Sequence, residues 1–488
     1  MAVISVVREL FMKRFLGVLS LFAFSAISLV GCGGGNGSTN FSTNPQNGAV
    51  YVTGEDAPLS SVVSLNLTIN SITLSGANSS PQLVSTPITV DFARLVGLRT
   101  PLAFGAVPAD TYTTATFVLA SPVINFVSSV APPQVSTLNG TFSNPSSTSP
   151  QTTSVTVTFP TPMVVGANGL AGLHTEFDIR QSLAVDGTGQ VTGLITPVMF
   201  IQAVTATDPQ GQITDLLGTI ASVNIAANSF VLQGPFGHQF TVTVNGSTNF
   251  NSGFTLSSLP TSGGFVSLQG TVQQDGSILA SDVEFITTDM AFVSGRILAL
   301  NPASGPVQTI TLWVDETGGG TASLVDTVQT IDVSGVTTYD VSFFNNSWFS
   351  PTNLFGNSSM LVGQRIFIGG TFHTPTFTPD LVSLRRQGVY GLVVPGSVTV
   401  TSGNAGNFQL LNTGLLGLSL GGPLTVNTGA GTLFFQGNSN TLTLTDLQTA
   451  SATASVPVVA RGLLLKDSVS GNPVLWSHRI RITEQQGH

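Results

Sequence analysis

Charged residues are scarce in this sequence. Only 14 of its 488 residues are Lys or Arg and 23 are Asp or Glu, so 8% are charged and the formal net charge is −9. An ordinary soluble domain carries about 25% charged residues. So few cations spread over this length cannot form the basic stripe that nucleic-acid binding requires, and we expect no nucleic-acid partner. The heptads of a coiled coil are missing, and a hydrophobic content of 41% excludes a disordered chain.

Cysteine is nearly absent as well. The single cysteine, Cys32, excludes an internal disulfide. It follows a positive segment ending at Arg14 and an apolar stretch from Phe15 to Ile27, which is too short for a permanent membrane span and typical of a signal peptide. The residues Leu29-Val30-Gly31-Cys32 resemble a bacterial lipobox. The resemblance implies that the cysteine is lipidated and the chain cut before it; the alternative is an ordinary secretory peptide that ends in Cys.

The first 46 residues are therefore predicted to contain a signal for export and a tether. Residues 1–31 form the signal peptide, and residues 32–46, rich in Gly, Ser, Thr and Asn, form a flexible linker. By resemblance to lipoprotein sorting in double-membraned bacteria, Gly33 in place of Asp after the cysteine implies the outer membrane. The N-terminal lipid is thus the expected link to a membrane, with the protein facing the periplasm or the cell surface.

Beyond residue 46 the dominant pattern is an alternation of apolar and polar residues. It recurs in Ser64–Asn70, Ser154–Phe159, Phe240–Val244 and Asn440–Thr445, between turns rich in Gly, Pro, Asn and Ser. Period two with β-branched residues is typical of strands. Few windows favour a helix, and we expect one helical turn within Asp91–Gly97. The pattern predicts an all-β protein built from antiparallel sandwiches or barrels.

The pattern also repeats three times in the second half of the chain. Each copy has a strand, a hairpin, a strand, a loop, a segment of the form G-x-φ-φ-φ-x-G and a last strand. That segment is Gly264–Gly270 in the first copy and Gly363–Gly369 in the second, and it is looser around Val458–Leu463 in the third. Units of this length can form small barrels of their own. We place three β-barrel modules at residues 214–288, 290–386 and 388–484.

Two stretches resemble known families. The frame GTI…NSFVL…TNF…GGFVSLQGT…DGSILASDVE, between Gly218 and Glu284, resembles a bacterial lipoprotein-associated domain family of unknown function. This resemblance implies a five- or six-stranded barrel of OB-like character, and the second and third copies match it with insertions.

The second resemblance covers Gly48 to about Thr205. Its matching segments are Gly54–Pro58, Val90–Leu95, Val107–Tyr112, Glu176–Leu183 and Ile195–Val198. They resemble a different family of unknown function that is common behind lipoboxes. The resemblance implies an immunoglobulin- or transthyretin-like β-sandwich, which we place at residues 47–207. Neither family implies an activity.

One short segment is the best candidate for a metal site. On a strand, His174, Glu176 and Asp178 would point to the same side. Carboxylate oxygens suit Ca²⁺, and an imidazole favours Zn²⁺. The three residues predict a metal site, with Ca²⁺ as the expected ion; the alternative is the solvent face of an amphipathic strand. No other cofactor is expected.

A run of aromatic residues is the candidate ligand-binding site. Phe343–Phe349 lies in the insertion of the second barrel, among Asn, Ser and Pro. Phe344, Trp348 and Phe349 could stack on sugar rings while neighbouring amides bind the hydroxyls. The alternative is a loop whose rings cap the open end of the barrel.

The sequence offers no catalytic constellation. No G-x-S-x-G elbow lies between a strand and a helix, and the five histidines are scattered. The adjacent acid pairs Glu55-Asp56 and Asp315-Glu316 lie in turn-like contexts, as corners of Ca²⁺ sites or as solvated loops. We predict a non-enzymatic binding or scaffold protein of the cell envelope that binds polysaccharide or an envelope protein. The alternatives are a polysaccharide-active enzyme whose carboxylate pair the sequence does not reveal, and a component that docks partners by edge-strand addition.

Overall fold

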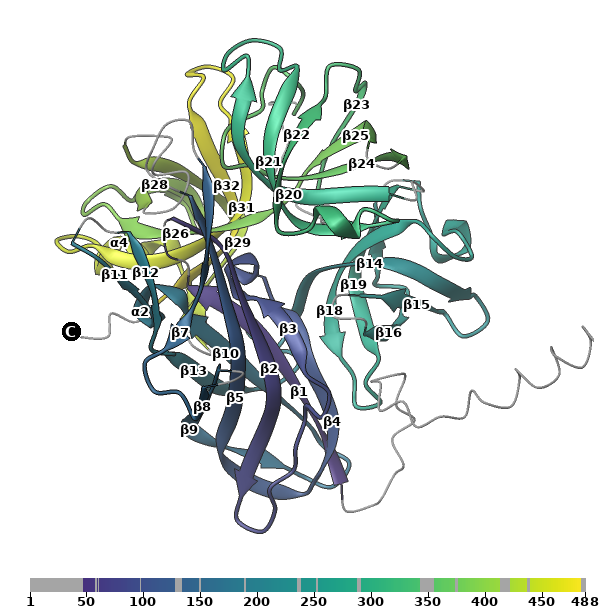
Figure 1. Cartoon of the computed structure of the whole chain (residues 1–488), viewed down its shortest axis with the longest axis vertical. Helices are drawn as coiled ribbons and strands as arrows, with labels where there is room; N and C mark the ends of the chain where they lie inside the picture. The colour runs from purple at the N-terminus through teal and green to yellow at the C-terminus, as the bar shows by residue number, and fades with distance from the viewer. Residues whose placement is uncertain are drawn as a thin grey trace, which may run out of the picture. The chain divides into compact units, whose positions relative to one another are not determined.

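The described parts of the chain consist almost entirely of β-strands arranged in several small sheets. The computed structural model (Figure 1) describes residues 47–57, 59, 61–96, 98–127, 134–148, 151–187, 190–234, 238–251, 253–287, 291–342, 355–373, 376–412, 422–436 and 439–483. The predicted signal peptide, tether and lipidated Cys32 lie outside these residues. So do the predicted ligand-binding residues Phe344, Trp348 and Phe349. None of the helices in the described ranges is long and apolar enough to cross a membrane.

The N-terminal part is a β-sandwich, as predicted. One sheet has the strand order β13-β10-β1-β4, and the other has the order β3-β2-β5-β9-β8, with β6 also paired to β5. Three short strands form a further sheet, β11-β12-β7. The elements are β1 (Asn47–Ala57), β2 (Val62–Gly76), β3 (Ile88–Asp91), η1 (Phe92–Leu95), β4 (Thr100–Pro108), β5 (Asp110–Val127), β6 (Val135–Asn139), β7 (Thr141–Phe142), β8 (Ser147–Thr148), β9 (Gln151–Val165), β10 (Leu170–Asp178), α2 (Ile179–Ser182), β11 (Leu183–Val185), β12 (Val191–Ile195) and β13 (Met199–Val204).

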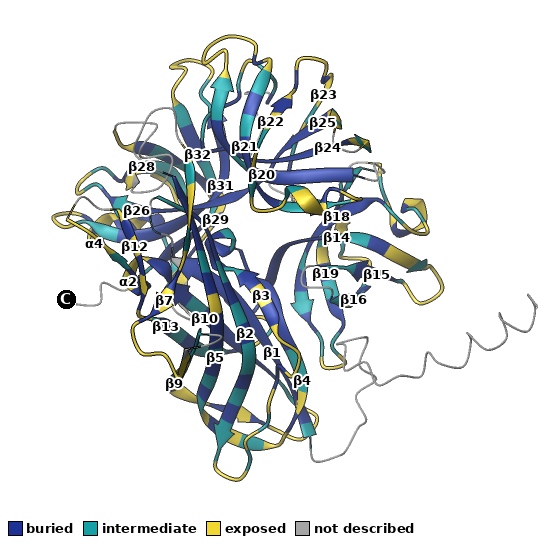
Figure 2. Ribbon diagram, viewed as in Figure 1, coloured by how far each residue is buried: buried dark blue, intermediate teal, exposed yellow. Residues whose placement is uncertain are grey.

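The alternation in β2 shows why this part of the chain forms a sandwich. Leu65, Leu67 and Ile69 are buried in the core between the sheets, and the residues between them face outward and are partly exposed (Figure 2). One feature differs from the predicted antiparallel arrangement, because β1 and β10 pair in parallel. These two strands lie far apart in the sequence, so no hairpin forces them to run antiparallel. The helical turn expected within Asp91–Gly97 is η1, which the Asp91 side chain caps.

The first barrel is a closed ring of five strands. β14 pairs with β15 and β18, β15 pairs with β16, and β18 pairs with β19. A short parallel contact between β16 and β19 closes the ring, and this closure confirms the OB-like character expected for the module. The elements are β14 (Ile213–Asn224), β15 (Ser229–Gln233), β16 (Gln239–Thr243), β17 (Asn249–Phe250), η3 (Leu256–Ser258), β18 (Phe265–Val272) and β19 (Ile278–Thr287).

The third barrel repeats this topology. Its ring runs β26-β28-β29-β32-β31, and a parallel pair, β29 with β32, again completes it. The elements are β26 (Gln387–Val393), β27 (Thr399–Ser402), β28 (Ala405–Asn412), β29 (Leu424–Gln436), β30 (Ser439–Leu442), α4 (Leu444–Ala450), β31 (Val456–Lys466) and β32 (Pro473–Ile482).

The second barrel follows the same order with one strand divided. β22 pairs with β21 and β23 pairs in parallel with β25, so two strands share the position that one strand fills in the other barrels. The elements are β20 (Ala291–Asn301), β21 (Thr309–Gly318), η4 (Ala322–Leu324), β22 (Thr327–Asp332), β23 (Thr338–Val341), β24 (Arg365–His373) and β25 (Thr376–Leu384). The three copies predicted from the sequence are therefore three versions of one fold.

A glycine recurs at one corner of every barrel. Gly270, Gly370 and Gly462 lie in β18, β24 and β31, at shifts in the register with the last strand. A Cβ atom on any of them would overlap the backbone carbonyl of the neighbouring strand. Glycine is required here because the two backbones approach closely at the bend. This explains the glycine that ends the repeated segment in the first copy, whereas in the second copy the required glycine, Gly370, directly follows the segment.

One predicted strand is shorter than expected. The alternation in Asn440–Thr445 suggested a strand throughout, but β30 ends at Leu442 and helix α4 begins at Leu444. The Thr443 side chain accepts a hydrogen bond from the backbone N–H of Asp446, and the Asp446 carboxylate accepts one from the N–H of Thr443. This reciprocal capping box starts the helix and overrides the alternation.

Small apolar clusters join the modules to one another. One lies between the first and second barrels, one between the sandwich and the second barrel, and one between the sandwich and the third barrel. Their buried members are respectively Leu217, Phe265, Phe292, Phe367 and Leu381; Val63, Val127, Leu298 and Trp313; and Val96, Tyr390 and Val459. The sandwich thus contacts the later barrels directly.

Candidate functional sites

The few cations of this chain are concentrated in its interior. Residues 47–488 contain 11 Lys and Arg residues, and seven of the arginines are at most 5% exposed. Burying a charged group costs several kcal/mol unless it is paired, so this placement requires a specific arrangement. The seven are Arg99, Arg365, Arg385, Arg386, Arg461, Arg479 and Arg481.

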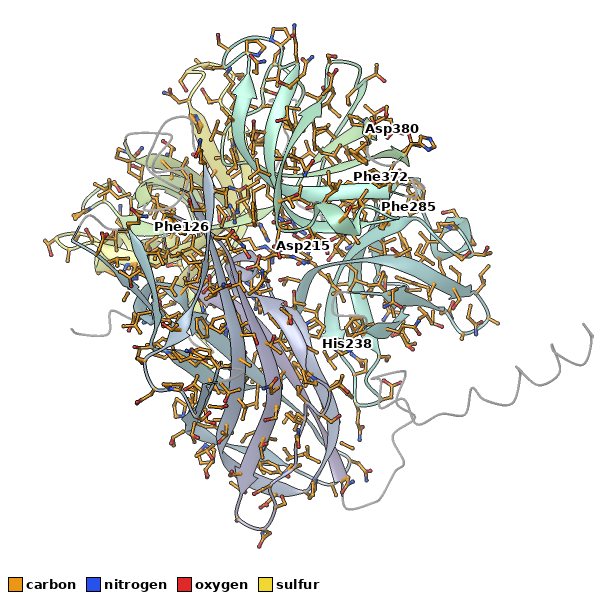
Figure 3. All side chains as sticks on the ribbon, in the orientation of Figure 1. Phe126, Asp215, His238, Phe285, Phe372 and Asp380 are labelled. Atoms are coloured by element: carbon orange, nitrogen blue, oxygen red, sulfur yellow. The ribbon has the colours of Figure 1, made fainter. Side chains whose placement is uncertain are left out.

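Asp215 of the first barrel, which is labelled in Figure 3, has more arginine partners than any other acid of the described residues. Its carboxylate lies 3.3 Å from Nη1 of Arg365, 3.7 Å from Nη2 of Arg385 and 3.2 Å from Nη2 of Arg461. The hydroxyl of Ser267 donates to it at 2.9 Å. Burial disfavours the charged carboxylate, but the arginines outweigh burial and hold the pKa of Asp215 well below its usual range. One carboxylate thus connects all three barrels.

The backbone at Asp215 is also unusual. Its φ is 56°, in the left-handed region that few residues other than glycine adopt. The register of β14 against β18 shifts at the same place, between Ile213 and Leu216. This bulge turns the carboxylate toward the arginines, and such local strain persists only where the surrounding contacts maintain it.

A second ion pair joins the first and second barrels. Glu284 in β19 accepts two hydrogen bonds from Arg385, at 2.9 and 3.1 Å, in the two-pronged geometry that gives the strongest pairs. The Ser342 hydroxyl donates a further bond to Glu284 at 3.0 Å. Because the pair is buried, removing either partner would leave an uncompensated charge.

The sandwich is attached to the third barrel in the same way. Glu176 of β10 accepts two hydrogen bonds from Arg481 of β32, at 2.6 and 2.9 Å. Glu55 of β1 lies 3.6 Å from Arg481 and 3.9 Å from Arg99. Burial opposes ionisation of Glu55, yet the charges of Arg481 and Arg99 lower its pKa.

Glu316 completes the set of acids. It lies 2.8 Å from Arg94 of the sandwich and 3.8 Å from Arg365 of its own barrel. Every module therefore contributes at least one charged group to a set of buried and partly buried charges, which we call the junction cluster. Its members are Arg94, Arg99, Arg365, Arg385, Arg386, Arg461, Arg479 and Arg481 together with Glu55, Glu176, Asp215, Glu284 and Glu316.

Two residues of the predicted metal site contact charged groups of the junction cluster, and the third caps a helix. Glu176 is paired with Arg481, and the Nε2 atom of His174 lies 3.6 Å from Glu55. Asp178 accepts a hydrogen bond from the backbone of Gln181 and caps the short helix α2. Within the described ranges, no group of three or more His, Cys, Asp or Glu side chains is arranged to hold a metal ion. The alternative of a solvent-facing strand is wrong, since His174 and Asp178 are buried.

The adjacent acid pairs likewise lie in strands and not in solvated turns. Glu55-Asp56 is in β1 and Asp315-Glu316 is in β21. Glu55, Asp56 and Asp315 are buried, and Glu55 and Glu316 face arginines. No Lys or Arg lies close to either pair in the sequence, so the sequence alone gives no sign of these partners.

A second feature is an uncharged outer face of the sandwich. Nine outward-facing residues of β2, β5 and β9 form a grid of three rows across the strands. In the middle row, Thr73 of β2 is paired with Thr116 of β5, and Thr116 is paired with Thr156 of β9. The rows on either side follow the same register. The Thr116 and Thr156 hydroxyls are hydrogen-bonded at 2.9 Å. We call this grid the hydroxyl face; it consists of Ser71, Thr73, Ser75, Thr114, Thr116, Val118, Ser154, Thr156 and Thr158.

The hydroxyl face is open to solvent. All nine of its residues are partly or largely exposed, and the side chains between those of β2 and β5 are buried in the core (Figure 2). Neighbouring strands lie about 4.8 Å apart, and alternate residues along a strand about 6.7 Å apart. The grid therefore presents eight hydroxyl groups and one methyl-bearing side chain, without a charge, at regular spacing.

Comparison with known proteins identifies one domain. Residues 47–193 match the model of a family described as a domain of unknown function (DUF4382). This part of the chain is similar to that family, and we call residues 47–193 the DUF4382 domain. The matched residues begin with β1 and end in β12, so the DUF4382 domain holds the hydroxyl face, Glu55 and Glu176. No curated protein matches the chain.

The junction cluster was not anticipated from the sequence. Arg385-Arg386 and the Arg479-Ile480-Arg481 run are conspicuous in a chain so poor in cations. Two arginines separated by one residue in a strand point to the same side, and that signal could have suggested a buried acidic partner. The partners themselves come from other modules, so sequence spacing does not reveal them.

Proposed function

We propose that the protein is a lipid-anchored, non-enzymatic binding protein of the bacterial envelope, and that its hydroxyl face binds neutral polysaccharide. The observation that carries the proposal is the uncharged grid around Thr73, Thr116 and Thr156. Ser and Thr hydroxyls both donate and accept hydrogen bonds, as sugar hydroxyls do. A sheet face whose hydroxyl groups are regularly spaced can contact successive units of an extended polymer.

The junction cluster supports a scaffold role for the rest of the molecule. Buried pairs such as Glu284 with Arg385 and Glu176 with Arg481 join modules that are distant in sequence. A binding face on a rigid protein loses less conformational entropy on association than a face on modules that move independently of one another. The barrels would hold the DUF4382 domain in a fixed position behind the N-terminal tether.

Retention on an immobilised neutral glucan tests the polysaccharide proposal. The variant Thr73→Ala/Thr116→Ala/Thr156→Ala removes the central row of hydroxyls and leaves the strand backbone intact. We expect it to elute earlier than the wild type with an unchanged melting temperature. The matched control, Thr330→Ala/Thr338→Ala/Thr399→Ala, removes three exposed strand threonines from the barrels and should be retained like the wild type. Equal retention of both variants would contradict the proposal.

The lipid anchor is tested separately. Cys32→Ser removes the only thiol of the chain, and we expect it to move the protein from the membrane fraction to the soluble fraction. Protease treatment of intact cells then distinguishes the cell surface from the periplasm. Unchanged partitioning of the Cys32→Ser variant would contradict lipidation.

A further inference from the structure

One corner of the junction cluster contains arginines that oppose one another. Arg461 in β31 lies directly opposite Arg479 in β32, and like charges in that position destabilise a sheet. Arg99 of the DUF4382 domain lies close enough for its charge to act on Arg479. Burial and the positive charges of Arg99 and Arg461 lower the pKa of Arg479 well below its usual range. Burial, opposed in part by the charge of Glu55, lowers the pKa of Arg99 to about 9.

The segment between the sandwich and the first barrel brings these groups together. Arg479 donates a hydrogen bond to the carbonyl of Pro209. Arg99 forms a backbone bridge with Thr214, and Arg461 is paired with the next residue, Asp215. A Cβ atom on Gly211 would lie 2.7 Å from the hydroxyl of Tyr51, so Tyr51 also borders this segment.

Several donors in this corner have no hydrogen-bond acceptor. They include Nε and Nη1 of Arg99, Nε and Nη1 of Arg461, and Nε of Arg479, although each side chain is at most 5% exposed. The Tyr51 hydroxyl is also without a partner. Buried donors are nearly always hydrogen-bonded in native proteins. Three guanidinium groups with free N–H donors therefore indicate that an acceptor belongs among them.

The ion pairs of this corner lead to the same conclusion. Arg99 is paired with Glu55 at 3.9 Å and Arg461 with Asp215 at 3.2 Å, but Arg479 has no ion pair with a carboxylate of the described residues. Glu55 is also shared with Arg481, and Asp215 with Arg365 and Arg385. The described carboxylates therefore leave this corner with an uncompensated positive charge.

We propose that Arg99, Arg461 and Arg479, with the Tyr51 hydroxyl, bind a small inorganic anion, and that this anion locks the DUF4382 domain to the first and third barrels. An anion between Arg461 and Arg479 replaces their repulsion with charge-assisted hydrogen bonds, which are about twice as strong as neutral ones. The burial of all four side chains restricts the ligand to an ion of a few atoms. This site is independent of the hydroxyl face and of polysaccharide binding.

Thermal unfolding of the full chain in detergent tests the site. The protein is first dialysed into potassium gluconate, whose anion is larger than chloride or phosphate. Chloride or phosphate then replaces gluconate at constant ionic strength. We expect the melting temperature to rise and saturate with at least one of the two ions. A response to chloride alone assigns a halide site, and a response to phosphate alone assigns an oxyanion site. Equilibrium dialysis with the radiolabelled ion should show a single saturable site.

Three variants assign the effect to this corner. Arg461→Gln should abolish the saturable rise, and Lys466→Gln, which removes a positive charge from the same strand near its exposed end, should keep it. Tyr51→Phe removes only one hydroxyl and should weaken anion affinity several-fold even if Arg461→Gln fails to fold. The proposal is overturned if the melting temperature is the same in all three anions, or if Tyr51→Phe and Arg461→Gln titrate like the wild type.

Discussion

Replacing Asp215 with Asn tests how much the junction cluster stabilises the protein. Asparagine has nearly the same shape and tolerates the left-handed backbone that Asp215 adopts, so the substitution removes the charge and little else. Arg365 and Arg461 lie 3.3 and 3.2 Å from the carboxylate and would lose their counter-charge. Removing one partner of a buried ion pair costs about 3–5 kcal/mol. That is a large part of the roughly 5–15 kcal/mol that stabilises a typical domain.

The assay is urea unfolding of the full chain at pH 7, followed by fluorescence and by circular dichroism. The matched control is Asp275→Asn, which removes the same charge from an exposed turn of the same barrel and should change stability by less than about 0.5 kcal/mol. Because the arginines hold the pKa of Asp215 below its usual range, its contribution is fully present above the unfolded pKa of about 3.9 and is lost only as the pH falls below it. A loss of less than about 1 kcal/mol for Asp215→Asn would refute the reasoning.

Three other predictions concern the glycines of the barrels, the effect of removing metal ions and the stability of the protein in acid. Gly270→Ala and Gly462→Ala should each destabilise the protein by about 1–3 kcal/mol, because a Cβ atom overlaps a backbone carbonyl there; Gly246→Ala, with nothing within 4 Å, should be neutral in the same melts. EDTA should leave the melting temperature unchanged, because Glu176 is already bound to Arg481; a drop would restore the metal prediction for His174, Glu176 and Asp178. Burial lowers the pKa of His174 to about 3, so its neutral form stabilises the fold above the unfolded pKa of about 6.5 and that contribution is lost as the pH falls toward 3. The loss of stability between pH 7 and pH 4 should therefore be smaller in His174→Gln than in the wild type, and an identical pH profile would contradict the assignment.

Much of the fold was predictable because a strand with one buried face produces a local alternation of apolar and polar residues. Alternation in Ser64–Asn70 reports a sheet with one buried face, and β2 confirms it. The final glycine of the repeated segment reports a bend that excludes a Cβ atom, as Gly270 shows. The pattern failed at Asn440–Thr445, where Thr443 and Asp446 form a capping box three residues apart. That signal was present in the sequence but conflicted with the alternation.

The junction cluster could not be predicted, because its partners are distant in sequence. Arg385 binds Glu284 across 101 residues, and Arg365 binds Asp215 across 150. Glu176, a residue of the predicted metal site, has a partner in Arg481 that lies 305 residues away. Local spacing reports which face of a strand a side chain occupies. It does not report which module covers that face.

The clearest test of whether the buried charges unite the four modules is differential scanning calorimetry of the full chain. Modules locked by buried ion pairs should unfold together, in a single transition whose calorimetric and van't Hoff enthalpies agree. Charge reversal at one pair, Arg481→Glu, should split this transition into two, and the paired reversal Glu176→Arg/Arg481→Glu should partly restore one. Separate transitions for the DUF4382 domain and the barrels in the wild-type protein would contradict the conclusion that the junction cluster makes them one body.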